Sequence, residues 1–81
     1  MEVIKAMAEI GNPNSISDAG VGALCARTAV MGAFMNVRIN AGGFDDKDFV
    51  TDVLNKGREI ENKAIALEME IIKIVNGKID L

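Results

Sequence analysis

The sequence predicts an all-α protein in which long antiparallel helices form a bundle. Two long segments repeat apolar residues at helical spacing, and clusters of Gly, Asn and Asp separate these segments from each other and from a short first segment. Hydrophobic residues make up 49% of the 81 residues. That is more apolar surface than three helices can hide among themselves. We therefore expect oligomerisation, or a missing N-terminal segment, to complete the bundle.

The first expected helix covers residues 2–10. Its apolar residues Val3, Met7 and Ile10 share one face at helical spacing. A helix with an apolar face begins at the very start of the chain. We therefore expect that Met1 replaces an upstream continuation of this helix.

A break follows this helix. Gly11 suits the position just after a helix end, and Pro13 cannot continue a helix. Two caps remain open for the next helix: Ser15 with Asp18 three residues later, or Ser17 with Asp18 in the first turn.

The second expected helix runs from about residue 17 to residue 41. Between Ala19 and Val37 its only charged residue is Arg27. Small residues form a stripe at 4-3-4 spacing, which lets another helix backbone approach closely. The stripe consists of Gly22, Ala26, Ala29 and Ala33. The sequence therefore predicts a central, buried helix.

This helix also has the ~20 apolar residues that a membrane span requires. Arg27 lies in its middle, however, where a charge costs about 2.5–3.5 kcal/mol on insertion scales. The flanks lack the Trp, Tyr or Lys clusters that anchor a spanning helix. We therefore expect no membrane contact.

Gly42 and Gly43 are expected to end the second helix, and Asp45 or Asp46 to cap the third. The third helix is predicted over about residues 46–75.

Apolar and small residues of the third helix follow a heptad seam over three repeats. The seam consists of Val53, Gly57, Ile60, Ala64, Leu67, Ile71 and Ile74. Because a glycine in a helix costs about 1 kcal/mol relative to alanine, Gly57 predicts a close helix crossing. Outward positions carry charged residues, namely Lys56, Arg58, Glu59, Glu61, Lys63 and Glu70. Residues 76–78 are expected to end the helix.

Composition excludes several classes of function. The net charge is −3 and the only aromatics are three Phe, which argues against nucleic-acid binding. The absence of His removes His-based triads and His metal ligands. One cysteine, Cys25, cannot form an internal disulfide, and the N-terminus lacks a signal-peptide pattern. A cytoplasmic location fits best.

Polar residues crowd the start of the second helix: Asn12, Asn14, Ser15, Ser17 and Asp18. Turn and capping chemistry alone would justify these residue types. The alternative is the edge of a polar pocket, since free N–H groups at a helix start hold anions and a carboxylate accepts two hydrogen bonds from an amidine-like edge.

Two amides, Asn36 and Asn40, lie one turn apart on the second helix, with Arg38 between them. They either fix helix register or recognise a flat heteroaromatic ligand, because buried amides need partners. Arg27 is either an ion-pair partner or the cation for a carboxylate-bearing substrate. We expect Cys25 and the five methionines to fill the core.

Three segments resemble a known family. Residues 11–23, GNPNSISDAGVGA, resemble the pattern G-N-x-x-x-x-S-D followed by apolar residues. Residues 32–40, GAFMNVRIN, resemble G-A-x-x-N-V-x-I-N, and residues 45–49, DDKDF, resemble a D-D/E-x-F opening of the final helix. Together, in this order, they resemble the formiminotetrahydrofolate cyclodeaminase / methenyltetrahydrofolate cyclohydrolase family. The resemblance covers almost the whole chain.

The resemblance implies an all-helical domain that dimerises through long packed helices and acts on one-carbon units of tetrahydrofolate. Residues 1–81 would form its C-terminal helical portion, less than half of the domain. The N-terminal helices, which carry an acidic residue proposed as acid/base, would be absent, so we expect no catalysis by this chain alone. No metal and no cofactor beyond the tetrahydrofolate substrate are implied.

The resemblance also implies roles for the polar residues. Asp18, with Ser17, would contact the pterin or orient water, and the shared pocket would include Asn12 and Asn14. Asn36 and Asn40 would bond folate heteroatoms, and Arg27 or Arg38 would face the glutamate tail. The expected function is interconversion of methenyl-, formyl- or formimino-tetrahydrofolate. The alternatives are a non-catalytic helical oligomerisation module and a small membrane protein.

Overall fold

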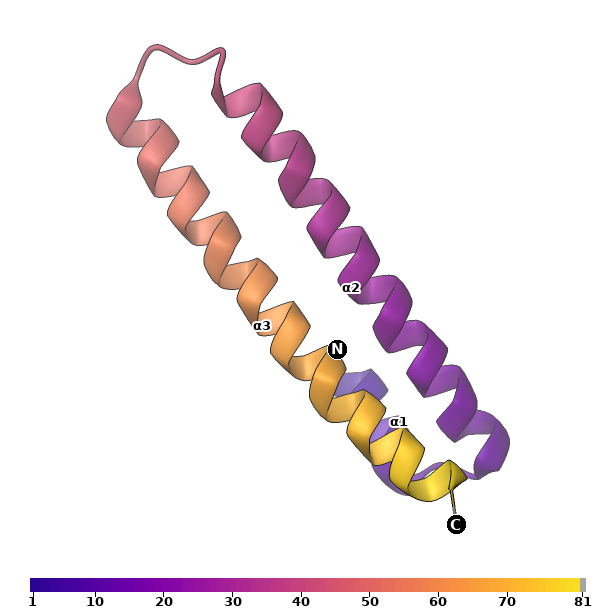
Figure 1. Ribbon diagram of the computed structural model, residues 1–81. Helices are drawn as coiled ribbons and strands as arrows, with labels where there is room; N and C mark the ends of the chain where they lie inside the picture. The colour runs from indigo at the N-terminus through magenta and orange to yellow at the C-terminus, as the bar shows by residue number, and fades with distance from the viewer. Residues whose placement is uncertain (81) are drawn as a thin grey trace.

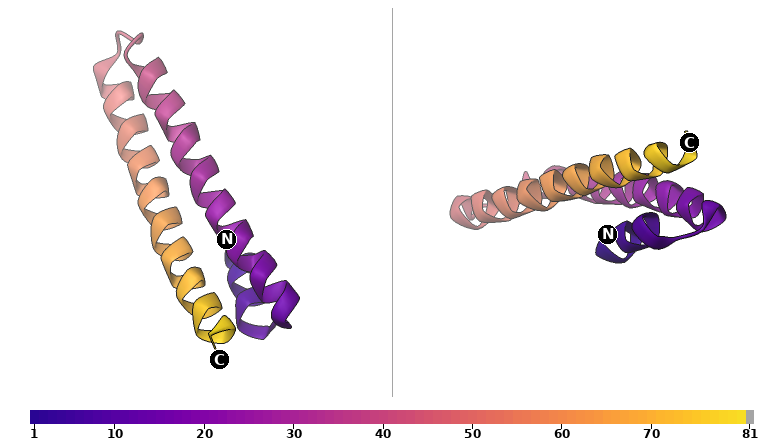
Figure 2. Two further views of the ribbon diagram at one scale, coloured as in Figure 1. Left: turned by 45° about the vertical axis from the view of Figure 1, so that its right-hand side comes forward. Right: turned by 90° about the horizontal axis from the view of Figure 1, so that it is seen from below.

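The computed structural model describes residues 1–80, which form three α-helices and no strand (Figure 1). α1 spans Glu2–Ile10, α2 spans Pro13–Ala41 and α3 spans Lys47–Ile79. The all-α prediction is confirmed. α2 and α3 form a long antiparallel hairpin, and α1 lies behind it in the view of Figure 1, near the end that carries the C-terminus (Figure 2). The resulting rod measures 54 × 17 × 15 Å.

The turn between α1 and α2 is tight at Gly11. Its backbone is extended (φ −76°, ψ 163°), so no left-handed conformation requires glycine here. A Cβ at this position would lie 2.5 Å from the Met7 carbonyl oxygen and 2.9 Å from the Ser15 Cβ. Glycine is therefore required by space.

α2 begins earlier than the sequence suggested. Asn12 is its N-cap: the Asn12 Oδ1 accepts a hydrogen bond from the Ser15 N–H at 3.0 Å, and Pro13 occupies the first turn. The prediction that Ser15 or Ser17 caps a helix starting near residue 17 was wrong. The physical reason is that proline is favoured in a first helical turn, where its missing N–H has no partner to lose.

At the other end of the hairpin, the turn matches one of the two predicted caps. α2 ends at Ala41 and Gly42 follows it. The Asp46 Oδ1 accepts a hydrogen bond from the Phe49 N–H at 3.0 Å, so Asp46, not Asp45, caps α3.

α3 extends beyond the predicted end at Val75 to Ile79. Asn76 and Gly77 stay helical although they were expected to end the helix. The Lys78 ammonium in this last turn donates a hydrogen bond to the Glu9 carbonyl oxygen of α1. This contact between distant parts of the chain outweighs the weak local preference to stop.

The core lies where all three helices meet. It consists of Ala8, Ile16, Ala19, Ala23, Ile71 and Val75, with Met1, Ile4 and Ile74 packed against it. Glycines allow the helices to approach closely: a Cβ at Gly20 would lie 3.3 Å from Val75, and one at Gly22 would lie 3.6 Å from Ile4. The small-residue character of α2 thus serves packing against α1 and α3 in this half of the rod.

The faces of α1 and α2 differ from the prediction. Val3, Met7 and Ile10 were expected to form the apolar face of α1, but all three are exposed, while Ala8 on another side of α1 is fully buried. α2 was expected to be central and buried. Most of its residues are exposed, including Ala29 and Ala33 of the predicted stripe. The reason is that α2 has one long neighbour, α3, and a short one, α1.

The face of α3 that is buried against its neighbours is displaced by one residue position from the predicted seam. Ala64 and Ile71 are buried as expected, but Ile60 is 59% exposed. Glu61, which was placed outward, is buried, and so is Glu68. The interface accepts these carboxylates because each pairs with an arginine.

One helical segment, Asn14–Ala41, is long and apolar enough to cross a membrane by length and composition alone. The core helix of a water-soluble protein passes the same test.

Candidate functional site

Arg27, the lone charge in the middle of α2, faces α3. Its guanidinium donates a hydrogen bond to Glu68 Oε2 at 2.9 Å, and the Glu68 side chain is 7% exposed. Of the two interpretations of Arg27, the structure therefore shows the ion pair. A second carboxylate, Glu61, pairs with Arg58 at 3.1 Å one turn earlier on α3.

The ring of Phe34 fills the space next to Gly57. A Cβ at Gly57 would lie 2.4 Å from this ring, so the glycine makes room for a side chain of α2. Arg38 and Arg58 stack over the ring, with their guanidinium carbons 4.9 and 5.1 Å from its centroid. Such cation–π contacts stabilise both guanidinium groups, in addition to the ion pair that Arg58 makes with Glu61.

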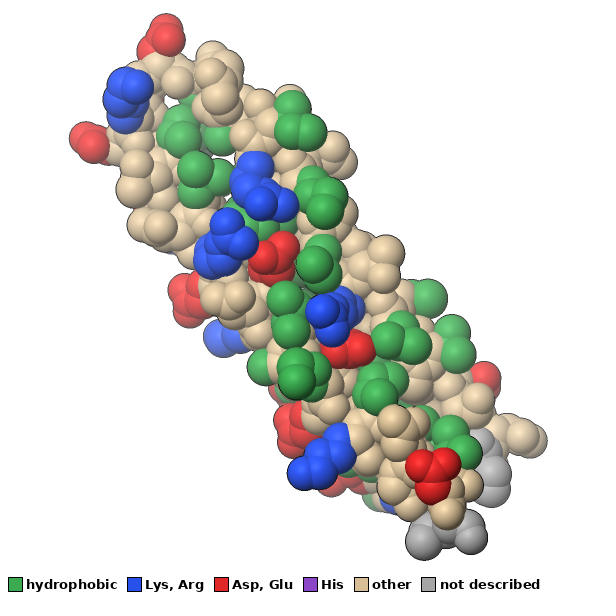
Figure 3. All heavy atoms as spheres, in the orientation of Figure 1, with side chains coloured by type: hydrophobic (Ala, Val, Ile, Leu, Met, Phe, Trp, Pro, Cys, Tyr) green, Lys and Arg blue, Asp and Glu red, His purple; other side chains and the backbone are tan. Residues whose placement is uncertain are grey.

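These side chains form a charged face of the hairpin. Figure 3 shows Lys or Arg and Asp or Glu side chains alternating along the seam between α2 and α3. The face in that view is the one away from α1. Arg27 and Arg38, one of which was expected to face a glutamate tail, are thus engaged with Glu68 of α3 and with Phe34, respectively.

The polar residues at the start of α2 divide into two groups. Asn12 has a structural role, because its side chain caps the helix. Asn14, Ser17 and Asp18 are exposed on the first two turns. Within residues 1–80 no tertiary hydrogen bond or ion pair engages the Asp18 carboxylate, which leaves it available to a ligand or to another chain.

Asn36 and Asn40 lie near the other end of α2, and both are exposed. The premise that these amides are buried was wrong, because α3 covers a different side of α2. Asp18 and Asn36 are 18 residues apart on one straight helix, which places them ~27 Å apart along its axis. A single chain therefore does not bring the predicted site residues into one pocket.

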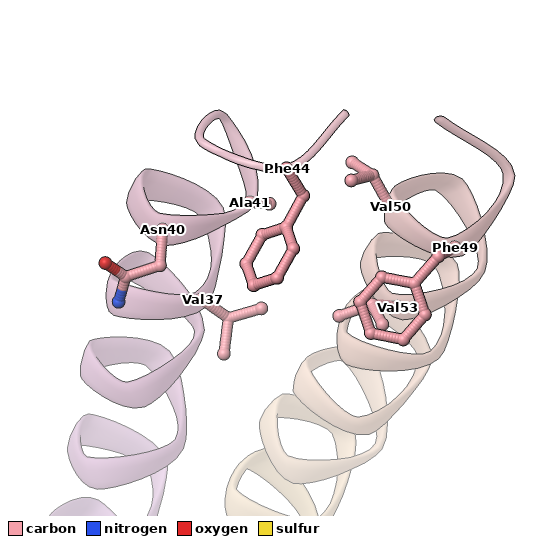
Figure 4. Close-up of a pocket in the computed structure, with 7 residues that line it drawn as sticks. All are labelled: Val37, Asn40, Ala41, Phe44, Phe49, Val50 and Val53. Carbon is pink, nitrogen blue, oxygen red and sulfur yellow. The ribbon is translucent and has the colours of Figure 1, made fainter. Parts of the chain in front are cut away.

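An apolar pocket of about 230 Å³ lies at the end of the hairpin that carries the α2–α3 turn (Figure 4). Phe44 and Phe49 form one part of its wall, with ring centroids 5.8 Å apart, and Val37 and Val53 project from the two helices. Asn40 lines the rim, and Figure 4 shows its amide pointing away from the phenylalanine rings. The pocket can hold apolar groups, but it offers few hydrogen-bond partners to a pterin.

A second apolar pocket, of about 210 Å³, continues the first toward the middle of the rod. It is lined by Val30, Ala33, Phe34, Val37, Gly57 and Ile60. Val37 lines both pockets, so they meet there. We call the two pockets together the distal groove.

Among residues 1–80, no group of three or more Cys, Asp or Glu side chains lies close enough to hold a metal ion. The pKa of Lys5 is raised, mainly by its hydrogen bond to Glu70 and then by the charge of that carboxylate, whose Oε1 is 2.7 Å away. This pair joins α1 to α3 and is a docking contact.

Sequence reasoning missed several residues that shape this surface. Glu68 and Glu61 were not recognised as partners of arginines, although an unpaired Arg27 on an apolar helix signalled that some carboxylate had to face it. The role of Phe44 and Phe49 was also missed. No local pattern reveals a wall made by two rings on opposite sides of a turn.

The chain was compared with known proteins. The profile of the family described as Formiminotransferase-cyclodeaminase matches residues 1–59, which is most of the chain. The chain belongs to this family.

A methenyltetrahydrofolate cyclohydrolase from Methylorubrum extorquens is 36% identical to the chain over 80 residues. The match covers 99% of the chain and 38% of the relative, so this member of the formiminotransferase-cyclodeaminase family spans well under half the length of that relative. No solved structure matches the chain. The family resemblance seen in the three sequence segments is thereby confirmed.

Proposed function

We propose that this family member takes part in tetrahydrofolate one-carbon metabolism, as part of a protein that interconverts methenyl- and formyl- or formimino-tetrahydrofolate. The observation that carries the proposal is the 36% identity, over 99% of the chain, to a protein named methenyltetrahydrofolate cyclohydrolase. Either reaction passes through a tetrahedral carbon between N5 and N10. The protein must move protons and hold both nitrogens in place.

Within this proposal the exposed polar residues of α2 bind the folate derivative. Asp18 accepts hydrogen bonds from the amidine-like edge of the pterin, and Asn36 and Asn40 bond ring heteroatoms. The side chains of Asp18, Asn36 and Asn40 are exposed, and Figure 4 shows the Asn40 amide pointing away from the phenylalanine rings, which leaves their hydrogen-bonding groups available. No cofactor besides the tetrahydrofolate substrate is required.

We also propose that the chain works in the cytoplasm, as a homo-oligomer, without binding nucleic acid or a membrane. The charge of −3 disfavours phosphate backbones. Although α2 has the length of a span, its neighbour α3 carries charges along its whole length, and the Arg27–Glu68 pair holds the two together. Moving α2 into lipid would break that pair.

Titration of the full chain with a reduced folate, followed by calorimetry and by the shift in melting temperature, tests the proposed function. We expect saturable binding in the wild type. Asp18→Ala and Asn40→Ala should each weaken it about tenfold or more, which corresponds to ~1.4 kcal/mol. Glu59→Gln changes an exposed carboxylate on α3 and should leave the affinity unchanged.

The second candidate function is a non-catalytic helical oligomerisation module. The exposed apolar surface of the distal groove and of α1 favours it. The titration separates the two: self-association without any folate binding would support the module and contradict the metabolic role.

A further inference from the structure

The charged face of the hairpin holds a pocket that the proposed function does not use. The pocket lies between α2 and the C-terminal half of α3 and has a volume of about 490 Å³. Its walls combine an arginine, a lysine, a carboxylate and an amide with two apolar side chains. The lining residues are Arg27, Glu68, Met69, Ile72, Lys73 and Asn76. We call it the Arg27–Lys73 pocket.

This pocket is separate from the residues proposed to bind the folate derivative. Arg27 is nine residues from Asp18 and nine residues from Asn36 on one continuous helix. Nine residues make two and a half helical turns, so Arg27 projects from the side of α2 opposite to these two residues. A ligand in the Arg27–Lys73 pocket therefore does not use Asp18 or Asn36 of the same chain.

The pocket carries one more positive charge than negative charge. Arg27 and Lys73 are its two cations, and Glu68 is its one carboxylate. The chain as a whole has a net charge of −3, so its overall field repels anions. An anion that binds here must therefore be held by local contacts, and a single negative charge balances the excess in the pocket.

Glu68 holds the guanidinium of Arg27 in place. The Arg27 Nη1 donates to Glu68 Oε2 at 2.9 Å, and the Glu68 side chain is 7% exposed whereas that of Arg27 is 35% exposed. A guanidinium has five N–H donors, and within residues 1–80 only this side-chain hydrogen bond engages that of Arg27. Because the planar group is already oriented, its remaining donors can bind a second oxyanion with little further loss of side-chain freedom.

Lys73 supplies the second cation from the other helix. Its side chain is exposed, and no carboxylate within residues 1–80 forms an ion pair with it. Asn76 follows one turn later on α3 and lines the same pocket with an amide that can donate or accept a hydrogen bond. A ligand that contacts both Arg27 and Lys73 would thus bridge α2 and α3.

We propose that the Arg27–Lys73 pocket binds a small organic monocarboxylate. The carboxylate accepts hydrogen bonds from the Arg27 guanidinium and the Lys73 ammonium. The apolar part of the ligand covers Ile72 and Met69, and Met69 is 62% exposed in the free chain. The pocket volume falls within the ~300–1,000 Å³ of small-molecule sites. It is therefore larger than one acidic side chain of another protein needs.

Benzoate is the probe that tests this assignment, and benzamide is its uncharged counterpart of similar shape. In NMR titrations of the full chain, benzoate should shift the Arg27 side-chain N–H signal and the methyl signals of Met69 and Ile72. We expect a dissociation constant on the order of a millimolar. Benzamide should bind about tenfold more weakly or less. Equal binding of both probes, or no shift at tens of millimolar benzoate, would overturn the proposal.

Two lysine variants test whether the binding is local. Lys73→Met removes the ammonium, keeps the apolar stem and should raise the dissociation constant of benzoate about tenfold. Lys63→Met is the matched control, because Lys63 is also an exposed lysine of α3 without an ion pair and lies outside the pocket. Circular dichroism verifies that both variants stay helical. Equal losses would mean that benzoate responds only to the overall charge of the chain and would overturn the proposal.

Arg27→Lys tests the guanidinium without removing the partner of Glu68. Lysine keeps a cation opposite the buried carboxylate, so the fold is retained, but it lacks the planar group of donors. We expect benzoate binding to weaken about tenfold. Unchanged affinity in this variant would show that the guanidinium does not hold the carboxylate.

Two further probes identify the source of the anion. Sulfate carries two charges and no apolar part, and N-acetylglutamate N-methylamide presents the carboxylate of a protein side chain. Both should bind more weakly than benzoate. Tighter binding of sulfate would assign the pocket to an inorganic anion, and tighter binding of the glutamate mimic would assign it to an acidic side chain of another protein. Either result would overturn the proposal, and neither affects the folate titration, which depends on residues on the other side of α2.

Discussion

At the scale of single residues, the contacts between α2 and α3 depend on a few unusual positions. Gly57 and Phe34 form a close-fitting pair, with the ring in the space that a side chain would take. Arg27 and Glu68 form an ion pair across this interface, in which the Glu68 side chain is buried and the Arg27 side chain is 35% exposed. Burying the Glu68 carboxylate is costly even when it is paired, so we expect the pair to fix which face of α3 meets α2 rather than to stabilise the fold.

Gly57→Ala and Gly77→Ala should have opposite effects on stability. The added methyl group at residue 57 would overlap the Phe34 ring, and we expect a loss of about 1–3 kcal/mol in the free energy of unfolding, despite the higher helix propensity of alanine. At residue 77 nothing lies within 4 Å, and we expect a gain of about 0.4–1 kcal/mol. Urea denaturation followed by circular dichroism measures both. Equal effects would mean that Phe34 moves aside at no cost.

At the scale of elements, the two long helices begin at polar caps, and the neighbours of each helix determine which of its sides is buried. α2 begins at Asn12 and α3 at Asp46, each through a side-chain oxygen that accepts a backbone N–H three residues on. Local chemistry fixed these starts. The end of α3 was decided by a contact with α1 instead, which is why the glycine at residue 77 does not end the helix.

Asn12→Ala removes the cap of α2. We expect a loss of about 1 kcal/mol in the free energy of unfolding, because the Ser15 N–H loses its acceptor. Asn14→Ala, two residues later on the exposed side, is the matched control and should change stability by less than about 0.5 kcal/mol. Thermal and urea denaturation test the difference. Equal losses would show that the hydrogen bond of Asn12 contributes nothing.

At the scale of the whole molecule, the chain is a rod with a filled end and an open end. The core of three helices occupies the end near residues 8–23, and the distal groove occupies the end near the α2–α3 turn. An 81-residue chain that leaves so much apolar surface in water has little stability to spare. Association would cover that surface.

The melting temperature should therefore rise with protein concentration. Only folded chains associate, so a higher protein concentration shifts the equilibrium from unfolded chains toward the folded oligomer. We expect the melting temperature of the wild type to rise by several degrees between micromolar and near-millimolar protein concentration. Ile60→Asp places a charge in the distal groove and should show a much smaller rise. Ile79→Asp changes an equally exposed isoleucine outside the groove and should behave like the wild type. Differential scanning calorimetry at a series of concentrations measures it. A melting temperature independent of concentration in the wild type would contradict association.

Much of the fold could be predicted from the sequence. Helical spacing and the breaks at residues 11–13 and 42–46 determined the number, order and approximate bounds of the helices, and the three segments with family patterns identified the family. These are local properties, since hydrogen bonding within a helix and the chemistry of turns act between residues close in the chain.

Only the tertiary structure decided which side of each helix is buried. It turned Arg27 toward Glu68, exposed Asn36, Asn40 and Ile60, and separated Asp18 from the two amides along the length of α2. A heptad pattern does not single out one face of a helix, and two adjacent faces of α3 are both apolar enough to pack against α2. The choice between them depends on where Phe34 fits against Gly57 and where each carboxylate finds an arginine, and these are distances between residues far apart in the sequence.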